Sequence, residues 1–206
     1  YETYVDRGSD FACVTQEGEV IAYQTGDGVV AWRELAGDIC YEAVRFAFGR
    51  PRYLSYLLDP GAHERLLNPQ EEQDDLLAGS YEVSSNRWNP KEGWGPQLVR
   101  THFFEASTPY ARKRQFHRVL PLDGEARPSV DVVALFSDGV ESFQDRDLNP
   151  VPLETVLVEL LALKALHGRF VTRRCKKFLE KLCAEKGWRH SDDFSMAAVA
   201  LEATCP

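Results

Sequence analysis

Residues 129–136 read SVDVVALF, an almost continuous apolar run, and a Ser-Asp-Gly turn with its aspartate at position 138 follows directly. A short apolar run that ends abruptly at turn-forming residues is typical of a strand buried on both faces. A second run, SMAAVALEA over residues 195–203, is preceded by Asp192 and Asp193. The sequence therefore predicts two buried strands, each with aspartate at one end.

These aspartates are the first candidates for chemistry. If the two strands are antiparallel neighbours, the end of one lies beside the start of the other, and Asp138 meets Asp192 and Asp193. Converging carboxylates raise each other's proton affinity unless a cation neutralises them, and all-oxygen ligands favour Mg²⁺ or Mn²⁺. Gly139 would let the backbone approach such a site closely. The alternative is that both groups are ordinary turns, because Ser, Asp and Gly are common turn residues.

The remaining patterns predict an α+β domain. Residues 63–96 are rich in polar residues, Gly and Pro, and they predict a loop-rich insertion. The strands at 97–105 and 115–122 are expected to pair with each other. Arg173, Arg174, Lys176, Lys177 and Lys181 are expected on the solvent face of the last helix. The other expected elements are a strand–turn–strand unit over 19–34, a strand over 39–48, a helix from Leu153 that ends near Gly168, and a helix over 171–182 that Gly187 stops.

Size and charge exclude some classes of protein. The chain has 206 residues, 44% of them hydrophobic, which suits one domain over residues 1–206. Its formal charge of −8 disfavours nucleic acid and anionic lipid as partners. No apolar run approaches the roughly 20 residues of a membrane helix. Five cysteines without metal-binding spacing are expected to be reduced thiols, which predicts a soluble, cytoplasmic protein.

Two segments carry a family resemblance. VALFSDGV at 133–140 resembles the Ser-Asp-Gly motif of metal-dependent serine/threonine protein phosphatases of type 2C, and DDFSMAAV at 192–199 resembles their closing motif. The resemblance implies antiparallel sheets packed as a β-sandwich flanked by helices. It also implies that Asp138 and Asp192 bind two Mn²⁺ or Mg²⁺ ions, with Asp193 in place of the family's usual asparagine. The implied activity is hydrolysis of phosphoserine or phosphothreonine in a protein substrate by a metal-activated water.

The amino-terminal half allows two alignments with that family. YQTGDGVV at 23–30 resembles its Gly-Asp hairpin, so that Asp27 shapes a turn and the first metal motifs lie upstream of Tyr1. In the other alignment Asp10, Asp27 and the Gly28 carbonyl join the metal centre. Neither alignment reproduces the family pattern in full, and no catalytic acid is assigned. The alternative function is a catalytically degenerate, phosphatase-like domain that binds a phosphoprotein or regulates a partner.

Overall fold

The computed structural model describes residues 4–5, 10–16, 19–46, 80–103, 116–120 and 130–201. Over these residues the chain is a mixed α+β protein with antiparallel strands and few helices. The strands are β1 (Tyr4–Val5), β2 (Asp10–Gln16), β3 (Glu19–Thr25), β4 (Gly28–Glu34), β5 (Ile39–Phe46), β6 (Ser80–Asn89), β7 (Gly93–Trp94), β8 (Leu98–Phe103), β9 (Phe116–Leu120), β10 (Val130–Phe136), β11 (Phe143–Gln144), β12 (Arg189–His190) and β13 (Met196–Ala200). The helical segments are η4 (Asp138–Glu141), α4 (Leu153–Leu161), α5 (Phe170–Lys177), η5 (Phe178–Cys183) and α6 (Ala184–Lys186).

The chain divides into two compact units. The first unit comprises Tyr1–Asp27, Glu42–Ser85 and Leu98–Arg127, and the second comprises Gly28–Tyr41, Asn86–Gln97 and Pro128–Pro206. One sheet has the strand order β1-β2-β3-β9, and the other has the order β13-β10-β4-β5-β6-β7 with β8 paired to β6. The predicted strand–turn–strand unit over 19–34 is confirmed as β3 and β4.

Strands β8 and β9 correct one sequence-based expectation. They were expected to pair with each other, but β8 pairs antiparallel with β6 and β9 pairs antiparallel with β3. In β9, Val119 and Leu120 lie opposite Ile21 and Val20 of β3. Both strands therefore pair with strands distant in the sequence instead of forming the expected local hairpin.

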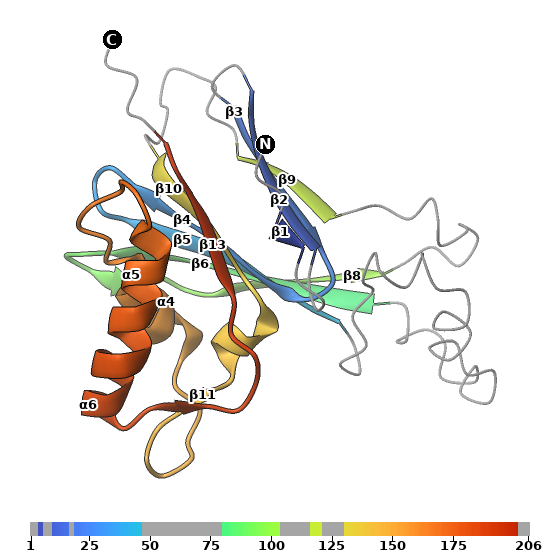
Figure 1. Cartoon of the computed structure of the whole chain (residues 1–206). Coiled ribbons are helices and arrows are strands. Elements are labelled where there is room, and N and C mark those ends of the chain that lie inside the picture. The colour runs from blue at the N-terminus through green and yellow to red at the C-terminus, as the bar shows by residue number, and fades with distance from the viewer. Residues whose placement is uncertain are drawn as a thin grey trace, which may run out of the picture. The chain divides into compact units, whose positions relative to one another are not determined.

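The second unit is built around β10 (Figure 1). β10 pairs antiparallel with β13 on one side and β4 on the other, with Phe136 opposite both Met196 and Val29. Residues 132–136 are at most 4% exposed, so the apolar run is buried on both faces, as its composition predicts. The expected antiparallel neighbours are thus confirmed.

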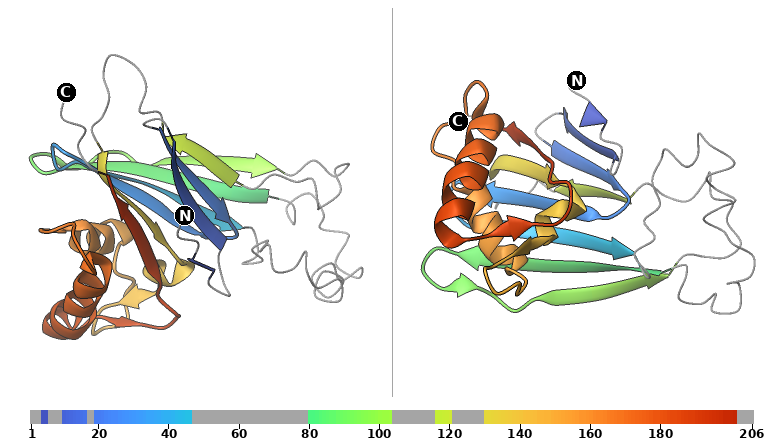
Figure 2. Two further views of the ribbon diagram at one scale, coloured as in Figure 1. Left: turned by 45° about the horizontal axis from the view of Figure 1, so that its top comes forward. Right: turned by 60° about the horizontal axis from the view of Figure 1, so that its bottom comes forward.

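Two helices cover one face of the β13-β10-β4 part of the sheet (Figure 2). α5, η5 and α6 form one continuous helix from Phe170 to Lys186, and Cys175 of this helix contacts Met196 of β13, sulfur to sulfur at 3.7 Å. Gly187 ends the helix with a left-handed φ of 71°, as predicted from the sequence. No helix among the described residues is long and apolar enough to cross a membrane.

The range 63–96, predicted as a loop-rich insertion, contains regular structure in its second half. β6 and β7 form a hairpin in which Trp88 lies opposite Trp94. The Gly95 N–H donates to the Arg87 carbonyl at 2.9 Å. β6 is rich in polar residues, and several of its side chains reach solvent. It therefore lacks the apolar alternation that signals a strand. Residues 63–79 lie outside the described residues.

Arg33 of β4 joins three elements of the second unit. Its guanidinium donates Nε and Nη2 to the two carboxylate oxygens of Asp131 at 3.0 and 2.6 Å. Its Nη1 donates to the carbonyls of Leu161 and Leu163 at 2.8 Å each, where α4 ends. Both charged side chains are about 15% exposed. The cation therefore satisfies carbonyls at the carboxyl end of the helix and also pairs with a strand carboxylate.

Replacing Arg33 by Ala is expected to lower the free energy of unfolding by about 2–4 kcal/mol, because it leaves Asp131 and the α4 carbonyls without their donor. Chemical denaturation measures the change. Lys176→Ala is the control, because its ion pair with Glu180 is exposed and should contribute less than about 0.5 kcal/mol. Equal losses in both variants would contradict the assigned role of Arg33.

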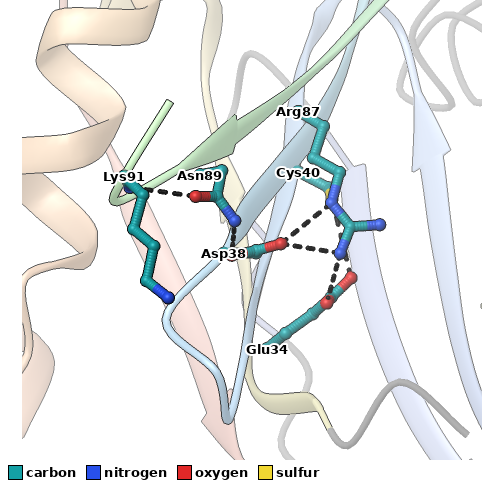
Figure 3. A network of polar contacts seen from close by, with 6 residues as sticks. All are labelled: Glu34, Asp38, Cys40, Arg87, Asn89 and Lys91. Atoms are coloured by element: carbon teal, nitrogen blue, oxygen red, sulfur yellow. Dashed lines mark hydrogen bonds and ion pairs between the residues drawn. The ribbon is translucent and has the colours of Figure 1, made fainter. Parts of the chain in front are cut away.

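A second polar network fixes the β4–β5 turn against β6 (Figure 3). Arg87 donates Nε and Nη2 to Asp38 at 3.0 and 2.7 Å, and Nη2 also donates to Glu34 at 2.8 Å. Asn89 donates to the other Asp38 oxygen at 2.9 Å. The Cys40 thiol points at Glu34, sulfur to oxygen at 3.8 Å. Burial, with Glu34 next in importance, raises the pKa of Cys40 to about 11.

This pKa predicts a pH-dependent contribution to stability. Between pH 9 and 11 the unfolded thiol loses its proton while the folded one keeps it, so Cys40 stabilises the fold less as pH rises. The difference in unfolding free energy between wild type and Cys40→Ala should therefore shrink across that interval. Urea denaturation at several pH values gives this difference, and a constant difference would refute the assigned pKa.

Candidate functional site

Asp138 lies in one turn, after β10, and Asp192 and Asp193 lie in another, before β13. The hydroxyl of Ser137 joins these two acidic turns. The Ser137 N–H donates to the Ser195 carbonyl at 3.2 Å, continuing the ladder between β10 and β13. The Ser137 Oγ donates to the Asp193 carbonyl at 3.1 Å and accepts from the Ser195 N–H at 2.9 Å. Ser137 is 6% exposed, so these bonds lie away from solvent. The loop before β13 is thus held against the end of β10.

Gly139 allows the same two turns to touch. A Cβ placed on Gly139 would lie 2.0 Å from the Asp193 carbonyl oxygen, closer than any real side chain approaches. Asp138 lies between Ser137 and Gly139, both of which contact the backbone of Asp193. The backbone at this glycine approaches the Asp193 carbonyl closely, which places Asp138 beside the Asp192–Asp193 turn; the metal site that it was predicted to serve remains a prediction.

Ser142 holds the other end of the η4 turn. Its Oγ donates to the Gly139 carbonyl at 2.8 Å and accepts from the Asp192 N–H at 3.3 Å. The His190 Nδ1 lies 2.9 Å from the Asp192 carbonyl oxygen. Sequence reasoning included Ser137 in the Ser-Asp-Gly motif without giving it a role and did not single out Ser142. A serine on each side of Asp-Gly is the signal in the sequence that points to them.

The carboxylates are partly occupied by their own turns. Asp138 Oδ1 accepts the Gly139 N–H at 2.9 Å, and Asp192 Oδ1 accepts the Asp193 N–H at 2.8 Å. Asp138 is half-buried, whereas Asp192 and Asp193 are exposed. Such bonds are what aspartate makes in an ordinary turn. They support the turn role, and the ligand role of these aspartates remains a prediction.

A group of aromatic rings packs next to these turns. Phe143 is fully buried, with ring centroids 5.3 Å from Phe178, 5.8 Å from Phe194 and 5.4 Å from His190. Phe194 directly follows Asp193, and His190 comes two residues before Asp192. Edge-to-face rings at such distances contribute beyond their buried area. The aromatic packing gives the exposed acidic loop a rigid base.

Gly28 lies at the same edge of the second unit as the acidic turns. Val29 pairs with Phe136, so Gly28, the first residue of β4, lies at the end of the sheet where Ser137 leaves β10. The backbone φ of Gly28 is 141°, a value that residues with a side chain rarely adopt. Asp27, half-buried in the turn between β3 and β4, belongs to the first unit. The predicted ligand roles of Asp27 and the Gly28 carbonyl remain predictions.

Asp10, a metal ligand in the second of the two alignments, is the first residue of β2. Its backbone pairs with that of Thr25. The predicted ligand role of Asp10 remains a prediction.

The donors at this edge were compared with what a divalent metal requires. Among the described residues, no three His, Cys, Asp or Glu side chains are grouped so that they could hold a metal ion. Asp138, Asp192 and Asp193 supply hard oxygen donors of the kind that Mg²⁺ and Mn²⁺ accept. Their chemistry suits such an ion, but together they form less than a complete ligand set. The two ions implied by the resemblance remain a prediction.

Comparisons of the chain with protein-family models, with curated proteins and with solved structures found no match.

Gly139→Ala is expected to destabilise the fold by about 1–3 kcal/mol or more, because the new methyl group overlaps the Asp193 carbonyl and forces the two turns apart. Gly95→Ala is the matched control, since its Cβ would meet its nearest neighbour at an ordinary 3.5 Å. Thermal and chemical denaturation of both variants measures the difference. A Gly139→Ala protein as stable as the Gly95→Ala protein would show that the turns are not packed this closely.

Proposed function

We propose that this chain is a metal-dependent phosphatase domain of the type 2C kind, acting on phosphoserine or phosphothreonine in proteins. The observation that carries the proposal is the joining of the Asp138 turn to the Asp192–Asp193 turn through Ser137 and Gly139. Two motifs 54 positions apart that resemble one family are thereby placed at one sheet edge, where their acidic side chains would act together. The antiparallel α+β fold is compatible with the proposal.

The proposal gives each residue of the two acidic turns a role in metal binding or in positioning the carboxylates. Asp138 and Asp192 would bind divalent cations, with Asp193 as a further oxygen donor. Bound Mn²⁺ or Mg²⁺ would supply Lewis acidity, which neutralises phosphate charge and lowers the pKa of an attacking water. Ser137, Gly139 and Ser142 position the carboxylates through the backbone and do not contact substrate. Asp27 and the Gly28 carbonyl are proposed as additional ligands.

A second candidate function is a degenerate domain that binds a phosphoprotein or regulates a partner without turnover. One observation favours it: within the described ranges the acidic turns form less than a full metal-binding group. Such a domain would keep the fold of the Ser137 region and lose metal-dependent hydrolysis. The two candidates therefore differ in a measurable property.

The test is hydrolysis of an aryl phosphate and a phosphothreonine peptide at millimolar Mn²⁺. We expect turnover that requires Mn²⁺, and a loss of at least about tenfold in kcat/KM in Asp138→Asn and Asp192→Asn. Mn²⁺ should also raise the Tm of wild type, because a ligand of the folded state stabilises it, and the shift should shrink in both variants. Asp147→Asn is the control, because Asp147 is exposed in a neighbouring turn.

The outcomes separate the two candidates. Absence of turnover together with phosphopeptide binding that depends on Asp138 would favour the degenerate domain. Absence of turnover, of binding and of any Mn²⁺-dependent shift in Tm would reject both. In chelating buffer, Asp138→Asn should be at least as stable as wild type, because one source of carboxylate repulsion is gone and the amide oxygen still accepts the Gly139 N–H.

A further inference from the structure

The charge of the chain is distributed very unevenly. Residues 164–189 contain nine Lys and Arg and two Glu, a formal charge of +7. Because the whole chain carries −8, the remaining residues carry −15. This basic stretch includes the entire continuous helix from Phe170 to Lys186 together with both of its ends. The electrostatic potential near this helix is therefore positive, although the protein as a whole is acidic.

Four cations form a row along this helix at four-residue intervals. Arg169, Arg173, Lys177 and Lys181 are all exposed. Residues four apart are neighbours on a helix surface, so these side chains follow one another along the solvent face. We call these four residues the basic row. Arg173 Nη2 also donates to the His167 carbonyl at 2.8 Å, which holds the tip of the side chain and leaves other guanidinium donors.

Other cations of the helix have acidic partners. Lys176 pairs with Glu180 at 3.9 Å, and Lys186 pairs with Glu159 at 3.0 Å. Arg174 was expected on the solvent face, but its side chain is only 10% exposed and it lies 3.6 Å from Glu159 of α4. In the part of the chain that the structure describes, no member of the basic row has such an ion pair. The row is thus the part of the helix whose cations make no ion pair with an acidic residue of the described part.

The basic row opposes the stability of its own helix. Like charges four residues apart destabilise a helix by about 0.2–0.5 kcal/mol per pair, and the row contains three such pairs. α5 has no acidic residue in its first turn, and Arg169 stands at its N-cap, where the helix dipole disfavours a cation. An anionic partner would relieve both effects.

We infer that the basic row docks an acidic segment of a partner protein. A short segment that lies along the helix meets the local positive charge, because charges more than about 10 Å away are screened. A duplex or an anionic membrane is larger and would also meet the acidic remainder of the chain. In addition, the most exposed large hydrophobic residues of the described part are Leu35, Leu98, Val99 and Leu148. None of them is on this helix, which disfavours base stacking and membrane insertion as its means of binding. This binding is independent of the proposed phosphatase activity.

The probe is a fluorescent twelve-residue peptide of alternating Glu and Ser, titrated with the full chain and followed by fluorescence anisotropy. We expect saturable binding that weakens as salt is raised from 50 to 300 mM. The double variant Lys177→Glu/Lys181→Glu should weaken binding at least tenfold, because it reverses the charge of two of the four members of the row. The control Lys91→Glu/Arg100→Glu makes the same change in net charge at exposed residues off the helix and should change affinity less than twofold.

Circular dichroism of both double variants shows whether each remains folded. A milder test at the same positions is the variant Lys177→Gln/Lys181→Gln, which only removes charge. Equal weakening in the Lys177/Lys181 and the Lys91/Arg100 charge reversals would show that only net charge matters and would overturn the inference. Absence of peptide binding to wild type would also overturn it. Tighter binding to a single-stranded oligonucleotide, or to vesicles with 30% anionic lipid, than to the peptide would assign the row to another class of partner.

Discussion

The hydroxyl of Ser137 is the contact on which the candidate site depends. It donates to the Asp193 carbonyl and accepts from the Ser195 N–H, so one buried side chain joins the end of β10 to the start of β13. Two carboxylate-bearing turns far apart in the sequence are brought together by this bond and by the absence of a side chain at Gly139. A buried hydroxyl that both donates and accepts is also costly to leave unpaired, which explains why this junction would tolerate little variation.

The surroundings of that junction are organised to keep it rigid. β10 is buried on both faces, and Arg33 connects β4 to β10 through Asp131 and to the carboxyl end of α4. Phe143 and Phe194 pack beneath the exposed acidic loop. Functional groups on loops act reproducibly only when a packed scaffold holds them. In this chain the scaffold consists of one sheet, two helices and an aromatic cluster.

Sequence reasoning found the strands, helices and turns that have strong local signals. The apolar run before Asp138, the Gly26–Gly28 turn and the end of the last helix at Gly187 were all predicted, because burial and left-handed glycine leave direct marks on residue choice. The partners of β8 and β9 were predicted wrongly, since partner choice between distant strands depends on side chains opposite each other. β6 was missed because its polar side chains hide the alternation of a strand.

The sequence predicted that the two aspartate-bearing turns lie side by side, but not the contacts that join them. The antiparallel neighbours and Gly139 followed from the apolar runs and the Asp-Gly step. The parts played by Ser137 and Ser142 depend on hydrogen bonds across 56 and 50 positions, which no local pattern encodes. Burial of Arg174 likewise depends on Glu159 of the neighbouring helix, so helical periodicity alone placed it on the wrong face.

Segment η5 (Phe178–Cys183) is a π-helical turn within the last helix. This turn affects how that helix tolerates the insertion or deletion of a residue. Phe178 and Cys183 are five residues apart and both buried, whereas in a regular α-helix a residue five positions on points about 140° away. The π-helical turn therefore absorbs one residue more than the packing needs. Deleting one residue from 179–182 would leave a regular α-helix with both buried side chains still facing inward. Adding one residue to the same segment would rotate Cys183 out of the core.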